Sequence, residues 1–95
     1  MKKYNIAVAG ATGLVGSTIL QVLEERDFPI ENIYFFSSKK SAGSSIEFMG
    51  SEYMVEELNE NSFDKEIDFI FFAAGGAVSQ KYAKLAVEKG IKVID

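Results

Sequence analysis

The chain has 95 residues, the size of a single domain. Its 14 acidic and 10 basic side chains give a formal net charge of −4. Without an extended basic stripe, this charge argues against a nucleic-acid or anionic-membrane partner. Hydrophobic residues make up 47% of the chain, which is enough for one core and argues against disorder.

Neither cysteine nor histidine occurs in the sequence. Disulfides, thiolate metal ligands, cysteine nucleophiles and the commonest acid–base group are therefore excluded. We expect no catalytic residue and no metal site within these residues. The longest apolar runs are about six residues, far short of the roughly 18–20 that span a bilayer, and no signal-peptide pattern is present. The sequence thus predicts a soluble, cytoplasmic protein.

The first half of the chain has a strand, a helix and a strand in succession. Residues 4–9 are apolar nearly throughout, as in a strand buried on both faces. A helix of about twelve residues follows, and Pro29 marks the end of the helical region before a second strand at residues 32–37. The spacing of apolar residues predicts that the buried face of this helix is formed by Leu14, Val15, Thr18, Ile19, Val22 and Leu23.

The second half begins with a polar loop and a predicted hairpin. The two strands, 46–49 and 52–55, flank Gly50-Ser51 as an insertion or edge of the sheet. Acidic residues concentrate between positions 47 and 68, and we interpret them as a solvated face.

Residues 67–72 form a third long strand, and a second helix is expected from about Ser79. Ser79 is predicted to cap this helix and Gly90 to follow its end. The expected inner face of the helix comprises Tyr82, Leu85, Ala86 and Lys89. Residues 91–95 form a last strand with nothing after it to leave the sheet, so we expect a truncated domain.

A glycine series, Gly10-Ala11-Thr12-Gly13-Leu14-Val15-Gly16, lies between the first strand and the first helix. In a dinucleotide-binding unit, Gly10 permits the turn, Gly13 lets the backbone approach a pyrophosphate and Gly16 lets the helix lie close to the sheet. The first N–H groups of the helix then face the anion. The alternative is a tight strand–helix turn without a ligand. In this position the series favours a Rossmann-like α/β fold: a doubly wound, mostly parallel sheet with a small hairpin insertion.

The end of the second strand carries the signal for the choice of cofactor. No Asp or Glu is present there to hold the ribose 2′-hydroxyl of NAD. Ser37, Ser38, Lys39, Lys40 and Ser41 occur instead, and their hydroxyl and ammonium groups favour the 2′-phosphate of NADP. The alternative is that both lysines only solubilise the loop.

Two further features have competing interpretations. The small residues 73–76 follow the third long strand, where they either approach a ribose or nicotinamide or serve helix–strand packing. Tyr53 and Tyr82 could donate to a ligand, but tyrosines on apolar faces more often belong to the core.

Four segments together resemble the N-terminal domain of bacterial aspartate-β-semialdehyde dehydrogenases. They are the glycine series at 10–16, Leu23–Pro29, the Ser38–Gly43 loop and Phe72–Ser79. The resemblance extends over essentially the whole chain. It implies an NADP-binding domain at residues 1–95 of an enzyme that reduces β-aspartyl phosphate with NADPH. The product is aspartate-β-semialdehyde, on the route to lysine, methionine and threonine.

The resemblance also assigns site residues and partners. It places phosphate contacts at Thr12, Gly13, Leu14 and Val15, which join Gly10 of the turn. It places 2′-phosphate contacts at Ser38, Lys40 and Ser41, and a contact near the ribose and nicotinamide at Ala74. Many relatives have Arg where this chain has Lys40, which weakens the expected preference for NADP. The family's catalytic Cys and His have no counterpart here, so we expect the catalytic and dimerisation domain outside this chain, an inactive fragment, and a homo-oligomeric full-length enzyme.

Two other functions remain open from the sequence. One is the cofactor domain of N-acetyl-γ-glutamyl-phosphate reductase, although the Ser-Ala-Gly loop at 41–43 argues against it. The other is a non-catalytic Rossmann protein that senses a dinucleotide. A reading frame that continues beyond codon 95 and encodes Cys and His would contradict the sensor.

Overall fold

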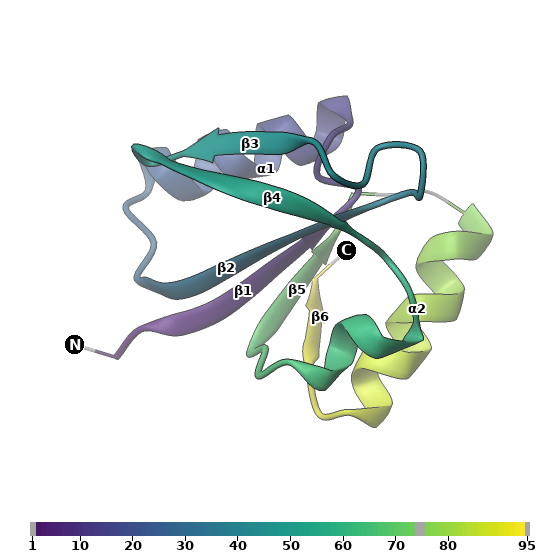
Figure 1. The fold of residues 1–95 in the computed structure, drawn as a ribbon. Coiled ribbons are helices and arrows are strands. Elements are labelled where there is room, and N and C mark those ends of the chain that lie inside the picture. Colours follow the sequence, from purple (N-terminus) through teal and green to yellow (C-terminus); the bar gives the residue numbers. More distant parts are fainter. Residues whose placement is uncertain (1, 74–75, 95) are drawn as a thin grey trace.

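The computed structural model describes residues 2–73 and 76–94, and it has one six-stranded sheet in the order β3-β4-β2-β1-β5-β6 (Figure 1). All neighbouring strands are parallel except β3 and β4. The predicted mostly parallel, Rossmann-like α/β fold is therefore confirmed. The elements in chain order are β1 (Tyr4–Ala9), α1 (Leu14–Glu25), β2 (Ile30–Ser37), β3 (Ser45–Phe48), β4 (Ser51–Glu57), the 3₁₀ helix η1 (Glu60–Asp64), β5 (Phe69–Phe72), α2 (Gly76–Glu88) and β6 (Lys92–Ile94).

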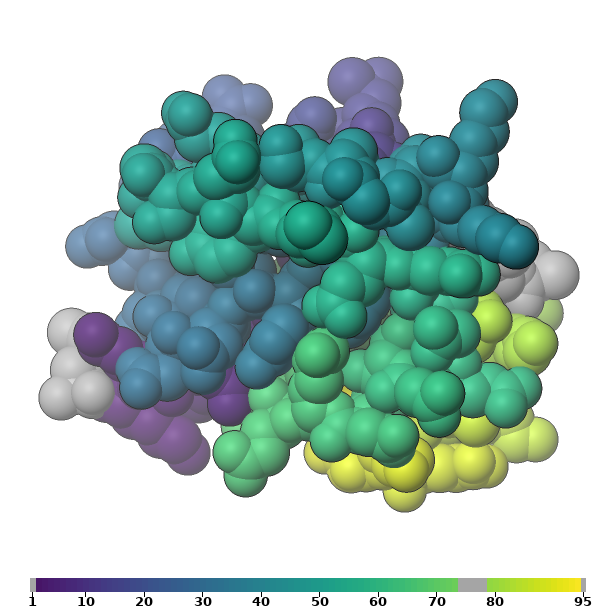
Figure 2. Space-filling view, in the orientation of Figure 1, coloured from purple at the N-terminus to yellow at the C-terminus, as the bar shows by residue number. Residues whose placement is uncertain are grey.

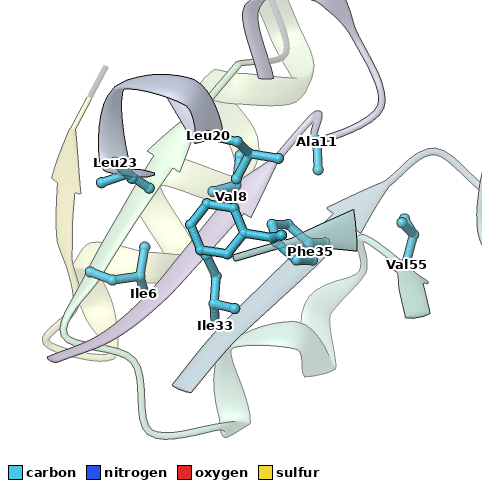
Figure 3. Close-up of a cluster of buried hydrophobic side chains, with 9 residues drawn as sticks. Ile6, Val8, Ala11, Leu20, Leu23, Ile33, Phe35 and Val55 are labelled. Carbon is cyan, nitrogen blue, oxygen red and sulfur yellow. The ribbon is translucent and has the colours of Figure 1, made fainter. Parts of the chain in front are cut away.

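The sheet separates two hydrophobic clusters because successive side chains of each strand point to opposite faces. On the α1 face, Ile6 and Val8 of β1 pack with Phe35 of β2, and Leu20 and Leu23 of α1 cover them (Figure 3). On the other face, α2 and η1 cover the cluster that contains Ala7, Ala9, Phe36 and Ile70. Neither helix in the described residues is long and apolar enough to cross a membrane.

Helix α1 has the predicted length, but its predicted buried face is only partly right: Leu23 is buried and Ile19 packs against the core cluster, whereas the other four predicted residues are exposed. The buried residues are Gly16, Leu20 and Leu23, whereas Leu14 and Val15 are 85% and 57% exposed. The helix has apolar side chains on more than one side, so their spacing alone does not select the face. Gly16 selects it, because a Cβ at that position would lie 2.4 Å from the carbonyl oxygen of Gly10 and only a glycine permits this contact.

Helix α2 begins at Gly76, so the prediction that Ser79 caps it is wrong: Ser79 lies inside the helix. An N-cap residue stands outside the helix with extended backbone, whereas Ser79 has three helical residues before it. The predicted end is confirmed. Gly90 has a φ of +81°, and the N–H of Ile91 donates to the carbonyl oxygen of Ala86 at 3.0 Å. Ala86 is fully buried as predicted, whereas Lys89 reaches outward to Asp64 at 3.0 Å.

The predicted hairpin lies at the edge of the main sheet, where β4 pairs in parallel with β2. Its turn lies one residue earlier than expected, on Met49 and Gly50, which have φ values of +49° and +83°. A two-residue turn with both φ values positive matches the twist of the flanking strands. The eight acidic residues between positions 47 and 68 are all exposed, which supports their interpretation as a solvated face.

Candidate functional site

The carboxyl ends of three parallel strands bring the predicted site segments together. The N–H groups of Gly10 and Ala11 both donate to the carbonyl oxygen of Phe36, at 2.8 and 3.1 Å. The glycine series after β1 therefore lies directly beside the loop after β2 (Figure 1). The N–H of Ala73, which follows β5, donates to Ala9 at 2.8 Å. Ligands of open α/β sheets bind at this edge.

Two of the three glycines are required by the fold, Gly10 in its predicted role and Gly16 in a related one. Gly10 has a φ of +82°, so it makes the sharp turn that other residues rarely adopt. Gly16 is in contact with the backbone of Gly10 and Ala11, which confirms close packing of the helix, although against the loop itself. Gly13 differs from both. A Cβ there would be 3.6 Å from the oxygen of Gly10, an ordinary contact, so the fold does not require glycine at this position.

The N-terminus of α1 has no capping side chain. Gly13 is the N-cap residue, with extended φ and ψ of −86° and 175°, and it makes no side-chain cap hydrogen bond. The first turn contains no acidic residue. The first N–H groups of an α-helix have no partner within the helix and carry the positive end of its dipole. Thr12, Gly13, Leu14 and Val15 are all exposed around this end, so the structure leaves room for an anion.

The loop after β2 folds into a tight turn. The carbonyl oxygen of Ser38 accepts hydrogen bonds from the N–H groups of Ser41 and Ala42, at 3.1 and 3.0 Å. Lys39 and Lys40 occupy the two central positions of this turn, and both are exposed. In Figure 2 the dark blue-green segment that contains this turn projects from the edge of the molecule. Ser38 and Ser41 thus stand at the two ends of one turn with the lysines between them.

Other predicted residues have simpler outcomes. Ala74 lies outside the described residues. The ring of Tyr53 is 5.4 Å from that of Phe35, and the ring of Tyr82 is 6.1 Å from that of Phe63, measured between centroids. Both tyrosines are half-buried against the hydrophobic clusters, which supports their assignment to the core.

One charged residue beside the site was not singled out in the sequence. Glu57, at the end of β4, is the parallel register partner of Ser37 and is exposed. No local motif could have identified it, because the pairing of β4 with β2 joins residues twenty positions apart. Its location next to the loop after β2 is a product of the tertiary structure.

A surface pocket of about 480 Å³ lies between α1 and the hairpin. Thr12 is the single predicted site residue in its lining, which also includes Gln21, Glu24 and Phe48. The pocket is therefore on the flank of the helix and does not coincide with the edge where the two loops meet. The candidate site is instead the open surface formed by the glycine series and the loop after β2.

Comparison with known proteins gives a consistent result. Residues 5–95 match the family model described as the semialdehyde dehydrogenase NAD binding domain. The chain is 57% identical to the aspartate-semialdehyde dehydrogenase of Campylobacter jejuni, over 99% of this chain and 28% of that protein. It is 47% identical to the enzyme of that name from Aquifex aeolicus, over 97% of this chain and 27% of that protein.

Solved structures agree with the sequence comparison. The crystal structure of aspartate semialdehyde dehydrogenase II from Vibrio cholerae, complexed with ASA, is similar with a TM-score of 0.93 and 38% identity. That match covers 99% of this chain and 30% of the Vibrio chain. The present chain thus spans less than a third of the length of these relatives. On the match over residues 5–95, the chain belongs to the family of semialdehyde dehydrogenase NAD-binding domains.

Proposed function

We propose that this chain is the NADP-binding domain, residues 1–95, of an aspartate-semialdehyde dehydrogenase. The observation that carries the proposal is the uncapped N-terminus of α1 beside a turn that presents two serines and two lysines. The pyrophosphate would bind at the helix N-terminus, where free N–H groups and the helix dipole favour an anion. The residues assigned to it are Gly10, Thr12, Gly13, Leu14 and Val15.

The choice of NADP rests on the chemistry of the loop after β2. A 2′-phosphate carries about two negative charges and three acceptor oxygens. Ser38 and Ser41 offer hydroxyl donors at the ends of the turn, and Lys40 offers an ammonium between them. Because an ammonium lacks the planar fork of a guanidinium, the preference for NADP over NAD is smaller than an arginine would give. Ala74 is proposed to lie near the ribose and nicotinamide.

We propose the whole protein's activity from the names of the relatives. It reduces β-aspartyl phosphate to aspartate-β-semialdehyde and releases inorganic phosphate, in the synthesis of lysine, methionine and threonine. Bound NADPH supplies the hydride for this reduction. The role of the present residues is to hold and orient the dinucleotide at the sheet edge. The thiol and the acid–base group that the family uses belong to polypeptide outside this chain, which has no Cys and no His.

Location and assembly follow from the same proposal. The enzyme works in the cytoplasm, as a homo-oligomer assembled through its catalytic domain. We propose no nucleic-acid or membrane partner, since the net charge of −4 opposes binding to polyanions.

Calorimetric titration with NADP and with NAD tests the cofactor assignment. The ionic strength is kept near 0.01 M, where the Debye length is about 30 Å and phosphate contacts are least screened. Circular dichroism of the same sample first establishes that the protein is folded. We expect NADP to bind several-fold more tightly than NAD. A folded protein that binds neither dinucleotide contradicts the proposal, and equal affinities contradict the assignment of the 2′-phosphate contacts.

A further inference from the structure

The end of β4 is hydrogen-bonded to both ends of the loop to which the 2′-phosphate contacts are assigned. The N–H of Leu58 donates to the carbonyl oxygen of Ser37 at 2.8 Å, where the loop begins. The N–H of Gly43 donates to the carbonyl oxygen of Val55 at 2.8 Å, where the loop returns. The loop therefore leaves the sheet beside Glu57 and returns to the sheet beside Val55, two residues before Glu57 in β4.

The side chain of Glu57 shares a face of the sheet with Ser37. Register partners in neighbouring parallel strands point to the same side, and side chains alternate along each strand. Phe35 and Val55 are partners and both belong to the cluster under α1. Two residues further along, Ser37 and Glu57 are partners on that same face.

The neighbouring carboxylate has a different environment. Glu56 is the partner of Phe36, which belongs to the opposite cluster. Its carboxylate oxygen is 3.7 Å from the Nζ of Lys65, so its charge is paired. Within the described ranges, no ion pair joins Glu57 to a cation. Two adjacent exposed acidic residues therefore differ in face and in pairing.

The charge of Glu57 is close enough to act on a bound phosphate. Neighbouring strands lie about 4.8 Å apart and successive Cα atoms about 3.8 Å, which places the Cα of Glu57 within about 9 Å of that of Ser38. This separation is shorter than the Debye length of about 10 Å at 0.1 M salt. The carboxylate thus repels a dianion at the 2′ position much more strongly than a neutral hydroxyl.

We propose that Glu57 is a specificity-determining residue that lowers the affinity for NADP relative to NAD. This inference rests on the proposed function. It identifies a negative charge from a different strand that opposes the positive charge of Lys40 at the same loop. The selectivity of this domain is then set by both groups and not by the loop after β2 alone.

The test compares Glu57→Gln with Glu56→Gln, which removes the adjacent charge from the opposite face. If the carboxylate and the phosphate are as far apart as this bound on the two Cα atoms, about 9 Å, with about two charges on the phosphate, Coulomb's law in water predicts a three- to fourfold gain in NADP affinity for Glu57→Gln at low salt. We expect a much smaller gain for NAD, a smaller NADP gain for Glu56→Gln because its charge lies on the opposite face, and the gains to disappear near 1 M salt, where the Debye length is about 3 Å.

The outcomes separate this inference from the proposed function. If the unaltered protein prefers NADP but Glu57→Gln binds it no more tightly, the inference fails and the proposed function stands. Equal gains for NADP in both variants, or equal gains for NADP and NAD in Glu57→Gln, also overturn the inference. A folded protein that binds neither dinucleotide overturns both.

Discussion

Replacement of Gly16 by alanine should destabilise the fold, although the same change helps most helices. The new Cβ would lie 2.4 Å from the oxygen of Gly10 and 2.9 Å from two backbone atoms of Ala11. Ordinary contacts start at 3.4 Å, so the first turn of α1 must move by about 1 Å. Backbone atoms cannot rotate away as the end of a flexible side chain can.

The expected magnitude is a balance of two effects. Overpacking costs about 1–3 kcal/mol, and the three short backbone contacts place this site at the upper end. The higher helix propensity of alanine stabilises the helix by about 1 kcal/mol relative to glycine and offsets part of this cost. We therefore expect the free energy of unfolding to fall by about 2 kcal/mol, a large share of the roughly 5–15 kcal/mol typical of a domain. In a domain of this length, each kcal/mol lowers the Tm by about 4–8 °C.

Urea denaturation followed by circular dichroism measures the change, with Gly13→Ala as the matched control. Gly13 is three residues away, and a Cβ there would be 3.6 Å from the same oxygen. We expect the control to remain within about 0.5 kcal/mol of the unaltered protein, because alanine caps less well than glycine but restricts the unfolded chain. Equal midpoints for the two variants would refute the claim that Gly16 sets the position of α1.

Three other changes test the site and the helix end. Lys40→Glu should weaken NADP binding by more than about 1 kcal/mol and hardly alter NAD binding. Lys39→Glu, outside the proposed contacts, should have a smaller effect. Equal losses of affinity for both cofactors in calorimetry would exclude the 2′-phosphate role of Lys40. Gly13→Val should keep the fold but weaken the binding of both dinucleotides about tenfold, by about 1.4 kcal/mol. The reason is that the branched side chain of valine would stand where the pyrophosphate approaches. Unchanged affinities would mean that the loop is only a turn. In Gly90→Ala the new Cβ has open space, but the residue must keep a φ of +81°. The free energy of unfolding should therefore fall by about 1 kcal/mol. An unchanged urea midpoint would contradict this reasoning.

Local sequence patterns determined the order and type of most elements. The apolar run at residues 4–9, the glycine series and the break at Pro29 predicted β1 and α1 almost to the residue, and β2 except for its first two residues. These signals are local because strand burial, positive φ and helix termination each depend on a few consecutive residues. The same holds for Gly90, whose left-handed conformation ends α2. The residues of the candidate site could be predicted from the sequence for this reason, since most of them belong to two short loops.

The tertiary structure decided which surfaces face each other. Several sides of α1 are apolar, and the contact of Gly16 with the backbone of Gly10 and Ala11 decided that Leu20 would be buried and Val15 exposed. Parallel pairing of β4 with β2 placed Glu57 beside Ser37, a neighbour that no spacing along the chain predicts. The periodicity of the sequence indicates how apolar each side of a helix or strand is. Backbone contacts and strand register between distant segments determine which side of that helix or strand faces the core. The sequence therefore determined the loops of the site, and only the packed sheet determined the charges around them.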